Sequence, residues 1–299
     1  MYLTLGPVLF NWPPDKWRDF YFRIADEAPI DVVYIGEIVC AKRIPFLVDA
    51  LPAAVSRLEA GGKKVILSSL ALMMSDRELS LAEEMASDGQ YMMEANDLAA
   101  VAMLGGHPHV IGPYINLYNE ATLELFAQRG AIRAVIAPEV PGRAIELLAR
   151  ASCPLEVQVF GRAPLAISAR CYHARAENLH KDRCRFVCER DPDGLPVHTL
   201  SGEPFLAVNG LQTLSHSCVN LAPHLPELKA FGVKHFRLSP HTADMVAISR
   251  LFHDAVRGRI EAEELTARLP RIADGAAFSD GFYRGDAGIT SSLALQEHH

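Results

Sequence analysis

Short apolar runs alternate with amphipathic segments along most of the chain. The apolar runs have the length and composition of buried strands, and the segments between them carry apolar residues at helical spacing. Trp17, Phe20 and Tyr21, for example, share one face of a helix predicted over 14–28. The pattern predicts strands at 3–10, 31–38, 64–70, 91–96, 109–116, 134–138, 155–160 and 235–239. It predicts further helices at 44–60, 76–87, 97–104, 121–129, 143–151 and 241–257.

Eight strands in regular alternation with helices predict an α/β fold, a closed parallel (β/α)8 TIM-like barrel. Because no G-x-G-x-x-G follows the first strand, an open dinucleotide-binding sheet is the weaker alternative. Ser75, directly before the helix that begins at Asp76, has the side chain of a helix N-cap.

About sixty residues separate the seventh and eighth predicted strands. This insertion, about 172–232, contains turn signals at 191–194 and 201–204 with short β-prone pieces between them, so we expect a small β-hairpin there. The predicted organisation is a barrel domain over 1–258 that carries the insertion, followed by a C-terminal helix and loop tail over 259–299.

Composition narrows the class of protein. Of 299 residues, 49% are hydrophobic and 22% are charged, which is ordinary for a globular chain. The net charge of −7 offers no electrostatic footprint for nucleic acid or an anionic membrane. No basic leader and no apolar run approaching ~18 residues is visible, so we expect a cytoplasmic protein without a transmembrane segment. In that reducing compartment, a group of cysteines binds metal more often than it forms disulfides.

Four cysteines form the main candidate site. Cys171, Cys184 and Cys188 follow the seventh strand with the spacing C-x12-C-x3-C, and Cys40 follows the second strand. Because active sites of this fold lie at the carboxyl ends of the strands, the four sulfurs are expected to converge. The spacing leaves an iron–sulfur cluster, a zinc site and unliganded thiols all open. Two further cysteines, Cys153 and Cys218, stand apart and fit small buried residues.

Polar residues also gather at the predicted strand ends. Each alone could be a helix cap or a salt-bridge partner, but together on one rim they favour a pocket for a polar small molecule. The candidate catalytic residues are Glu37, Asn96, Asp97, Asn116, Glu139 and Arg237, and Asn119 is a further polar residue of the same rim. The methionine-rich stretches 72–74 and 91–93 could line an apolar path, although core packing explains them more simply.

The stretch from Glu156 to Cys171 resembles the signature of the collagenase-like peptidase family, U32, which has Glu, Gly and Ser-Gly-Arg-Cys in corresponding places. Two departures are visible: the family's usual upstream cysteine is Pro164, and the Gly before Arg-Cys is Ala169. With these two departures, the stretch resembles the branch of the family that acts in oxygen-independent ubiquinone hydroxylation. That branch is matched again by 36–43, 67–72, 94–98, 181–184, 209–213 and 237–240, and the likeness covers about residues 1–245.

The resemblance implies a [4Fe-4S] cluster on Cys40, Cys171, Cys184 and Cys188. It further implies a heterodimer with a homologous U protein that hydroxylates aromatic-ring precursors of ubiquinone without oxygen, with prephenate as the hydroxyl donor. These lipid substrates would be presented by a soluble biosynthetic complex. The chain would be a subunit of this enzyme and not a functional peptidase. The alternatives are a relative that acts in RNA hydroxylation and a non-catalytic binding module stabilised by a metal.

Overall fold

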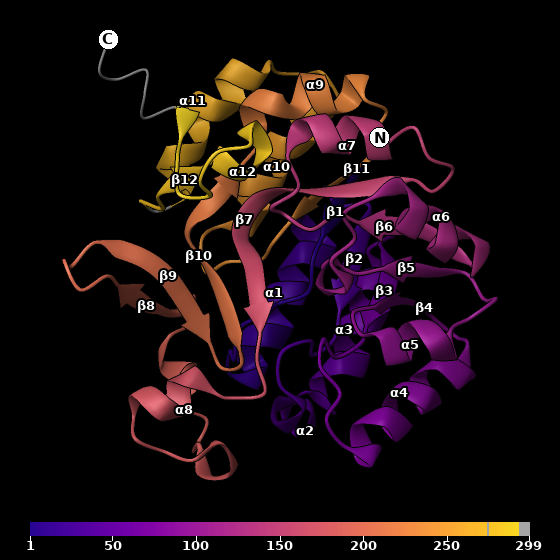
Figure 1. The fold of residues 1–299 in the computed structure, drawn as a ribbon, viewed down its shortest axis with the longest axis vertical. Coiled ribbons are helices and arrows are strands. Elements are labelled where there is room, and N and C mark those ends of the chain that lie inside the picture. The colour runs from indigo at the N-terminus through magenta and orange to yellow at the C-terminus, as the bar shows by residue number, and fades with distance from the viewer. Residues whose placement is uncertain (274, 293–299) are drawn as a thin grey trace.

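The computed structural model describes residues 1–273 and 275–292, and within them eight parallel strands close into a ring surrounded by helices (Figure 1). The strand β11 pairs with both β1 and β7, and this double pairing closes the barrel. The predicted (β/α)8 barrel is therefore confirmed. The strands of the ring are β1 (Tyr2–Leu5), β2 (Val32–Ile35), β3 (Lys64–Ser68), β4 (Met92–Ala95), β5 (His109–Ile111), β6 (Ala131–Val135), β7 (Leu155–Ile167) and β11 (His235–Leu238).

Some of the helices between the strands begin at a residue whose side chain caps them. Ser75, Asp97 and Asn119 each accept a hydrogen bond from a backbone N–H in the first turn of α4, α5 and α6. The outer helices are α1 (Pro14–Glu27), α2 (Ile44–Leu47), α3 (Ala50–Ala60), α4 (Asp76–Asp88), α5 (Leu98–Met103), α6 (Glu120–Gln128), α7 (Gly142–Leu148) and α10 (Met245–Val256). Among the described residues, no helix is both long and apolar enough to cross a membrane.

Several predicted elements differ from the structure. The strand expected over 3–10 ends at Leu5, the strand expected over 134–138 lies at Ala131–Val135, and the strand expected over 155–160 continues to Ile167. The strand expected over 109–116 ends at Ile111, because Gly112 and Pro113 lead into a short 3-10 helix, η2 (Pro113–Ile115). The helix expected over 44–60 is divided into α2 and α3. Pro52 lacks the N–H that would have bonded the carbonyl of Val48, so a continuous helix loses a bond at this point.

The insertion forms an antiparallel sheet outside the ring. The first half of β7 belongs to the barrel, and its second half pairs with β10 (Gln212–Asn220). Next to β10 lies β9 (Pro204–Asn209), followed by β8 (Leu195–His198). The predicted hairpin is confirmed and is joined to the barrel through β7. Gly161 permits the change of direction: its φ is +103°, and a Cβ there would lie 2.8 Å from the carbonyl oxygen of Ser239.

The remaining short helices lie in the insertion and towards the C-terminus. They are α8 (Tyr172–Ala176), η3 (Lys181–Arg183), η4 (Val187–Arg190), η5 (Ala222–His224), α9 (Leu225–Ala230), α11 (Ala262–Ile272) and α12 (Gly281–Arg284). The two-residue strand β12 (Phe278–Ser279) pairs in parallel with β10. The last part of the predicted tail, residues 293–299, lies outside the described residues.

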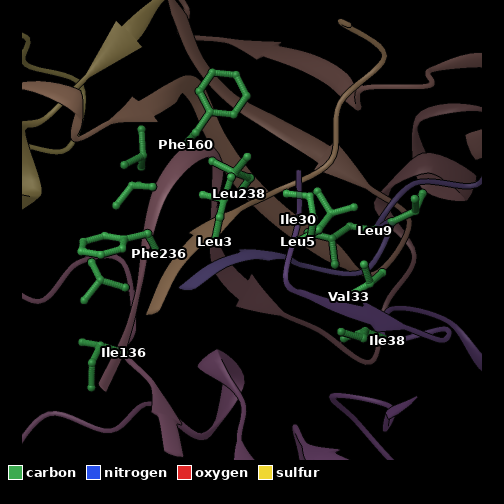
Figure 2. Close-up of a cluster of buried hydrophobic side chains, with 14 of the residues drawn as sticks. Leu3, Leu5, Leu9, Ile30, Val33, Ile38, Ile136, Phe160, Phe236 and Leu238 are labelled. Carbon is green, nitrogen blue, oxygen red and sulfur yellow. The ribbon is translucent and has the colours of Figure 1, made fainter. Parts of the chain in front are cut away.

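The main hydrophobic core fills the space between the ring and the helices. Alternate strand residues such as Leu3 and Leu5 of β1, and Phe236 and Leu238 of β11, pack there with Phe160 (Figure 2). Because successive strand residues point to opposite faces, the residues between them face the inside of the ring. A smaller apolar cluster lies there, made of Val32, Tyr34, Ile66, Val110 and Val135. Polar side chains occupy much of the remaining interior.

The half-buried His235, at the start of β11, is expected to make stability depend on pH. Its ring stacks on Tyr2 with 4.8 Å between centroids, and Arg133 Nη1 lies 3.0 Å from its Nδ1. Burial and then the Arg133 cation lower the pKa of His235 to about 4. Since the unfolded residue titrates near pH ~6.5, the unfolded chain takes up the proton first as pH falls. We expect the free energy of unfolding to drop by about 1–2 kcal/mol between pH ~6.5 and ~4, a value discounted for partial exposure.

Urea unfolding at pH ~7.5 and ~5 measures this effect. The variant His235→Gln removes the titrating ring, so its stability should change less between the two pH values than that of the wild-type protein. An equal change in both proteins would mean that other groups govern the pH dependence.

Candidate metal centre

Cys40 is held by the loop that follows β2. Glu37 Oε1 accepts hydrogen bonds from the backbone N–H groups of Val39 and Cys40, at 2.7 and 2.9 Å. Cys40 then begins the short 3-10 helix η1 (Ala41–Arg43). A Cβ at Gly36, whose φ is +138°, would lie 2.8 Å from the carbonyl oxygen of Ser68, so the loop crosses the end of β3 closely. The buried Glu37 carboxylate thus sets the direction of the cysteine loop.

The other three candidate cysteines lie in the first part of the insertion. Cys171 is the N-cap residue of α8, and the N–H of Tyr172 donates to Gly210 O at 2.9 Å. This bond ties the Cys171 segment to the turn between β9 and β10. Cys184 ends η3, and the buried Cys188 lies in η4.

Contacts between the two segments bring the four cysteines to one end of the barrel. Lys42 Nζ donates to the carbonyl of Lys181 at 2.8 Å and lies 2.9 Å from Asp182 Oδ1. The rings of Phe46 and Phe186 meet edge to face with centroids 4.7 Å apart. In Figure 1 the corresponding elements, α2 and α8, lie at the same end of the molecule.

The thiols are close enough to influence one another electrostatically. Burial is the main cause of the raised pKa of Cys40, and the charge of Cys171 raises it further. Burial likewise raises the pKa of Cys171, with additional contributions from Cys188 and Cys184. Because metal ligation requires thiolates, binding of a metal at these cysteines would release their protons.

Arg43 supplies a buried cation beside these thiols. Its guanidinium donates to Leu9 O at 3.0 Å and to Asn209 Oδ1 at 2.9 Å, and it lies 3.8 Å from Glu37 Oε1. The thiol of Cys188 lies near enough to act on it electrostatically. Burial disfavours the cation, but Glu37, Cys188 and Cys40 outweigh this effect, so the pKa of Arg43 is raised. One side chain therefore links the barrel, the Cys40 loop and the insertion.

The backbone between Cys184 and Cys188 has an uncommon conformation. Cys184 is right-handed, with φ −70°, whereas Arg185 and Phe186 are left-handed, with φ of 51° and 52°. Non-glycine residues of this kind cost free energy and concentrate at functional sites. A right-handed residue followed by a left-handed one directs consecutive N–H groups to one side, an arrangement that binds anions and is found around iron–sulfur sites.

The residues present fit a cluster in donor type and electrostatics. All the cysteines are free thiols, and a buried cation and a strained N–H-bearing turn accompany the four that converge. Within residues 1–273 and 275–292, no three His, Cys, Asp or Glu side chains already lie close enough to hold a single metal ion. A cubane differs from a single ion in this respect, because each of its irons takes its own thiolate.

Cys153 and Cys218 are buried elsewhere. Cys153 Sγ lies 3.7 Å from Ala131 O, and Cys218 Sγ lies 3.5 Å from His241 Nε2. Burial raises the pKa of Cys153 to about 11 and that of Cys218 to about 12. Both have the surroundings of inert core thiols.

The proposed polar rim divides into residues with different roles. Asp97 and Asn119 cap helices, and the exposed Asn116 ends η2 in a left-handed conformation. Glu139 Oε1 accepts from the hydroxyl of Tyr118 at 2.5 Å, at the surface. These four are not brought together into one pocket. The other three are buried: Glu37 lies in the Cys40 loop, and Asn96 and Arg237 lie in the barrel interior.

The barrel interior holds a network of charges that the sequence analysis missed, apart from Arg237. Arg237 Nη1 donates to Glu94 Oε1 at 2.6 Å and lies 3.4 Å from Glu156 Oε1. Arg133 Nε lies 3.1 Å from Glu156 Oε2, to which the Tyr34 hydroxyl donates at 2.6 Å. The positive charges of the two arginines are thus balanced by the negative charges of the two carboxylates. The signal in the sequence was the presence of charged residues inside otherwise apolar strands.

Fold and candidate site together describe a (β/α)8-barrel protein in which the Cys40 loop contacts the segment that carries Cys184 and Cys188. The chain belongs to peptidase family U32, whose family model matches residues 18–292. The match covers the ring strands from β2 to β11 and all four cysteines.

Proposed function

We propose that the chain holds a [4Fe-4S] cluster on Cys40, Cys171, Cys184 and Cys188. The observation that carries this proposal is the contact of the Cys40 loop with the segment that carries Cys184 and Cys188, through Lys42 and Phe46, beside the buried cation Arg43. A cluster of this kind supplies one-electron transfer when bound. The chain's own residues provide the thiolates, and Arg43 offsets their negative charge. Glu37 and the turn at 185–186 orient the two cysteine loops.

We further propose that the chain is a subunit of an oxygen-independent hydroxylase acting on aromatic-ring precursors of ubiquinone. It would work as a heterodimer with the homologous U protein, with prephenate as the hydroxyl donor. Support comes from the U32 family match and from the sequence features around Pro164, Ala169 and the cysteines that resemble this branch. With every iron ligated by a cysteine, the cluster would serve electron transfer more naturally than substrate binding.

Anaerobic purification followed by iron, sulfide and zinc analysis tests the cluster. The expected result is about four irons and four sulfides per chain, with broad absorbance near ~400 nm. Replacing Cys171 by Ala should remove most of the iron, whereas Cys153→Ala, a matched change of a cysteine outside the set, should retain it. One zinc and no colour would instead favour a metal-stabilised binding module.

Deletion of the gene tests the wider function. Ubiquinone should fall in cells grown without oxygen and remain normal in aerated cells, and a plasmid copy with Cys171→Ala should fail to restore it. Normal anaerobic ubiquinone together with a missing RNA hydroxylation would assign the chain to the RNA-modifying alternative.

A further inference from the structure

A cavity of about 220 Å³ opens beside the candidate metal centre. Its two walls are formed by α2 and α3 on one side and by α4 on the other, and its floor by the ends of β2 and β3. Leu47 and Leu51 line the first wall, and Leu81 and Met85 line the second. The cavity therefore lies on the face of the barrel where this fold builds its binding sites.

The size and lining of the cavity suit one aromatic ring. An apolar cavity of about 150 Å³ is enough to hold benzene, so this one has room for a substituted ring but not for a long chain as well. Apart from Glu78, whose Oε2 accepts from the N–H of Met74 at 2.5 Å, the walls are aliphatic and thioether side chains. They disfavour an anionic ligand, which would lose its hydration without gaining a partner.

The floor of the cavity is polar and adjoins Cys40. Glu37 and Ser69 line it. The two backbone bonds to Glu37 and its contact with Arg43 all end on Oε1, which leaves Oε2 to accept from a ligand hydroxyl. Because Oε1 also binds the N–H of Cys40, a ligand on this carboxylate would be separated from the cysteine loop by a single side chain.

An exposed apolar side chain belongs to the cavity lining. Val48, which lies between α2 and α3, is 61% exposed. A polar floor below an apolar wall and an apolar exit matches a ring with a hydroxyl at one end and a hydrocarbon substituent at the other.

We infer that this cavity binds the ring of a prenylated phenol, with the phenolic hydroxyl on Glu37 and the prenyl chain leaving over Val48. The choice of this substrate class rests on the proposed function. The bound ring would lie next to the Cys40 loop.

Calorimetric titration of the anaerobically purified full chain with 2-geranylphenol tests the inference. Leu81→Trp fills the cavity from α4, and we expect it to raise the Kd at least tenfold. Ser80→Trp places the same side chain on the exposed side of α4 and should leave the Kd within twofold. Leu51→Trp fills the cavity from the opposite wall, and it is measured instead if Leu81→Trp does not fold.

Unchanged affinity in a folded Leu81→Trp or Leu51→Trp protein would overturn the inference. So would equally tight, equally sensitive binding of geraniol, which has the chain but no ring. Iron content and the anaerobic ubiquinone phenotype test the proposed function separately. A chain that makes ubiquinone but binds 2-geranylphenol independently of Leu81 refutes only the cavity assignment. A chain that binds 2-geranylphenol in this cavity, but contains no iron and is not needed for anaerobic ubiquinone, refutes only the proposed function.

Discussion

Glu156→Gln is expected to lower the free energy of unfolding by about 3–5 kcal/mol. Glu156 is fully buried, and its carboxylate accepts from Thr4 at 2.8 Å and from Tyr34 at 2.6 Å, beside Arg133 and Arg237. Burial alone would raise the pKa of Glu156, but the two arginines outweigh it and lower that pKa. The amide keeps the shape of the side chain and removes its charge, which leaves Arg237 with Glu94 and takes from Arg133 the carboxylate that it contacts.

Urea unfolding measures the loss, and a double-mutant cycle shows its cause. Arg133→Met removes the cation nearest Glu156 Oε2. Combined with Glu156→Gln, it restores the balance of charge, so the double variant should lose clearly less stability than the sum of the two single losses. Strictly additive losses would show that the charges act independently and would contradict this explanation.

Arg43→Met is expected to cost about 3–5 kcal/mol and to remove most of the iron from the anaerobically purified protein. Without the guanidinium, the buried Glu37 loses its cation, Asn209 Oδ1 loses a donor, and Leu9 O keeps only the bond from Asn209 Nδ2. The Cys40 loop and the insertion then lose the side chain that joins them through Glu37 and Asn209. Iron analysis and urea unfolding of the same preparations measure both effects.

Two controls separate charge from geometry at Arg43. Arg43→Lys keeps the charge but lacks the planar fork that reaches several acceptors, so we expect intermediate iron content. Arg57→Met removes an exposed arginine that pairs with Asp26 on the surface, and it should retain wild-type iron. Full iron in Arg43→Met would show that the cysteines converge without this cation.

The local pattern of the sequence was enough to predict the barrel. Each strand–helix unit carries its own periodicity and often its own cap, as with Ser75 before α4. Closure of the sheet could be predicted as well, because eight strand–helix units are the number that forms a closed (β/α)8 barrel. The thiol candidates followed from the same rule, since residues after β2 and after β7 leave the ring on one face. Whether the four thiols bind a cluster stays a prediction.

The charge network could not be predicted in this way, because its partners meet only in the closed barrel. Arg237 and Glu94 are 143 residues apart in the chain and lie on strands that are not neighbours in the ring. No local pattern couples them. Asp97 and Asn119 were predicted as rim residues, but in the structure they cap helices. Their local pattern has two explanations, because the end of a strand is often close to the start of a helix, where a polar residue serves as a cap.

The closing of the ring by β11 has a consequence for the protein during its synthesis. β1 finds its second neighbour only when β11, which begins at residue 235, has left the ribosome. Until then the nascent barrel exposes β1 as a sheet edge, and such edges recruit other strands and promote aggregation. β1 has only four residues, so it offers few backbone groups for a mistaken pairing during this interval.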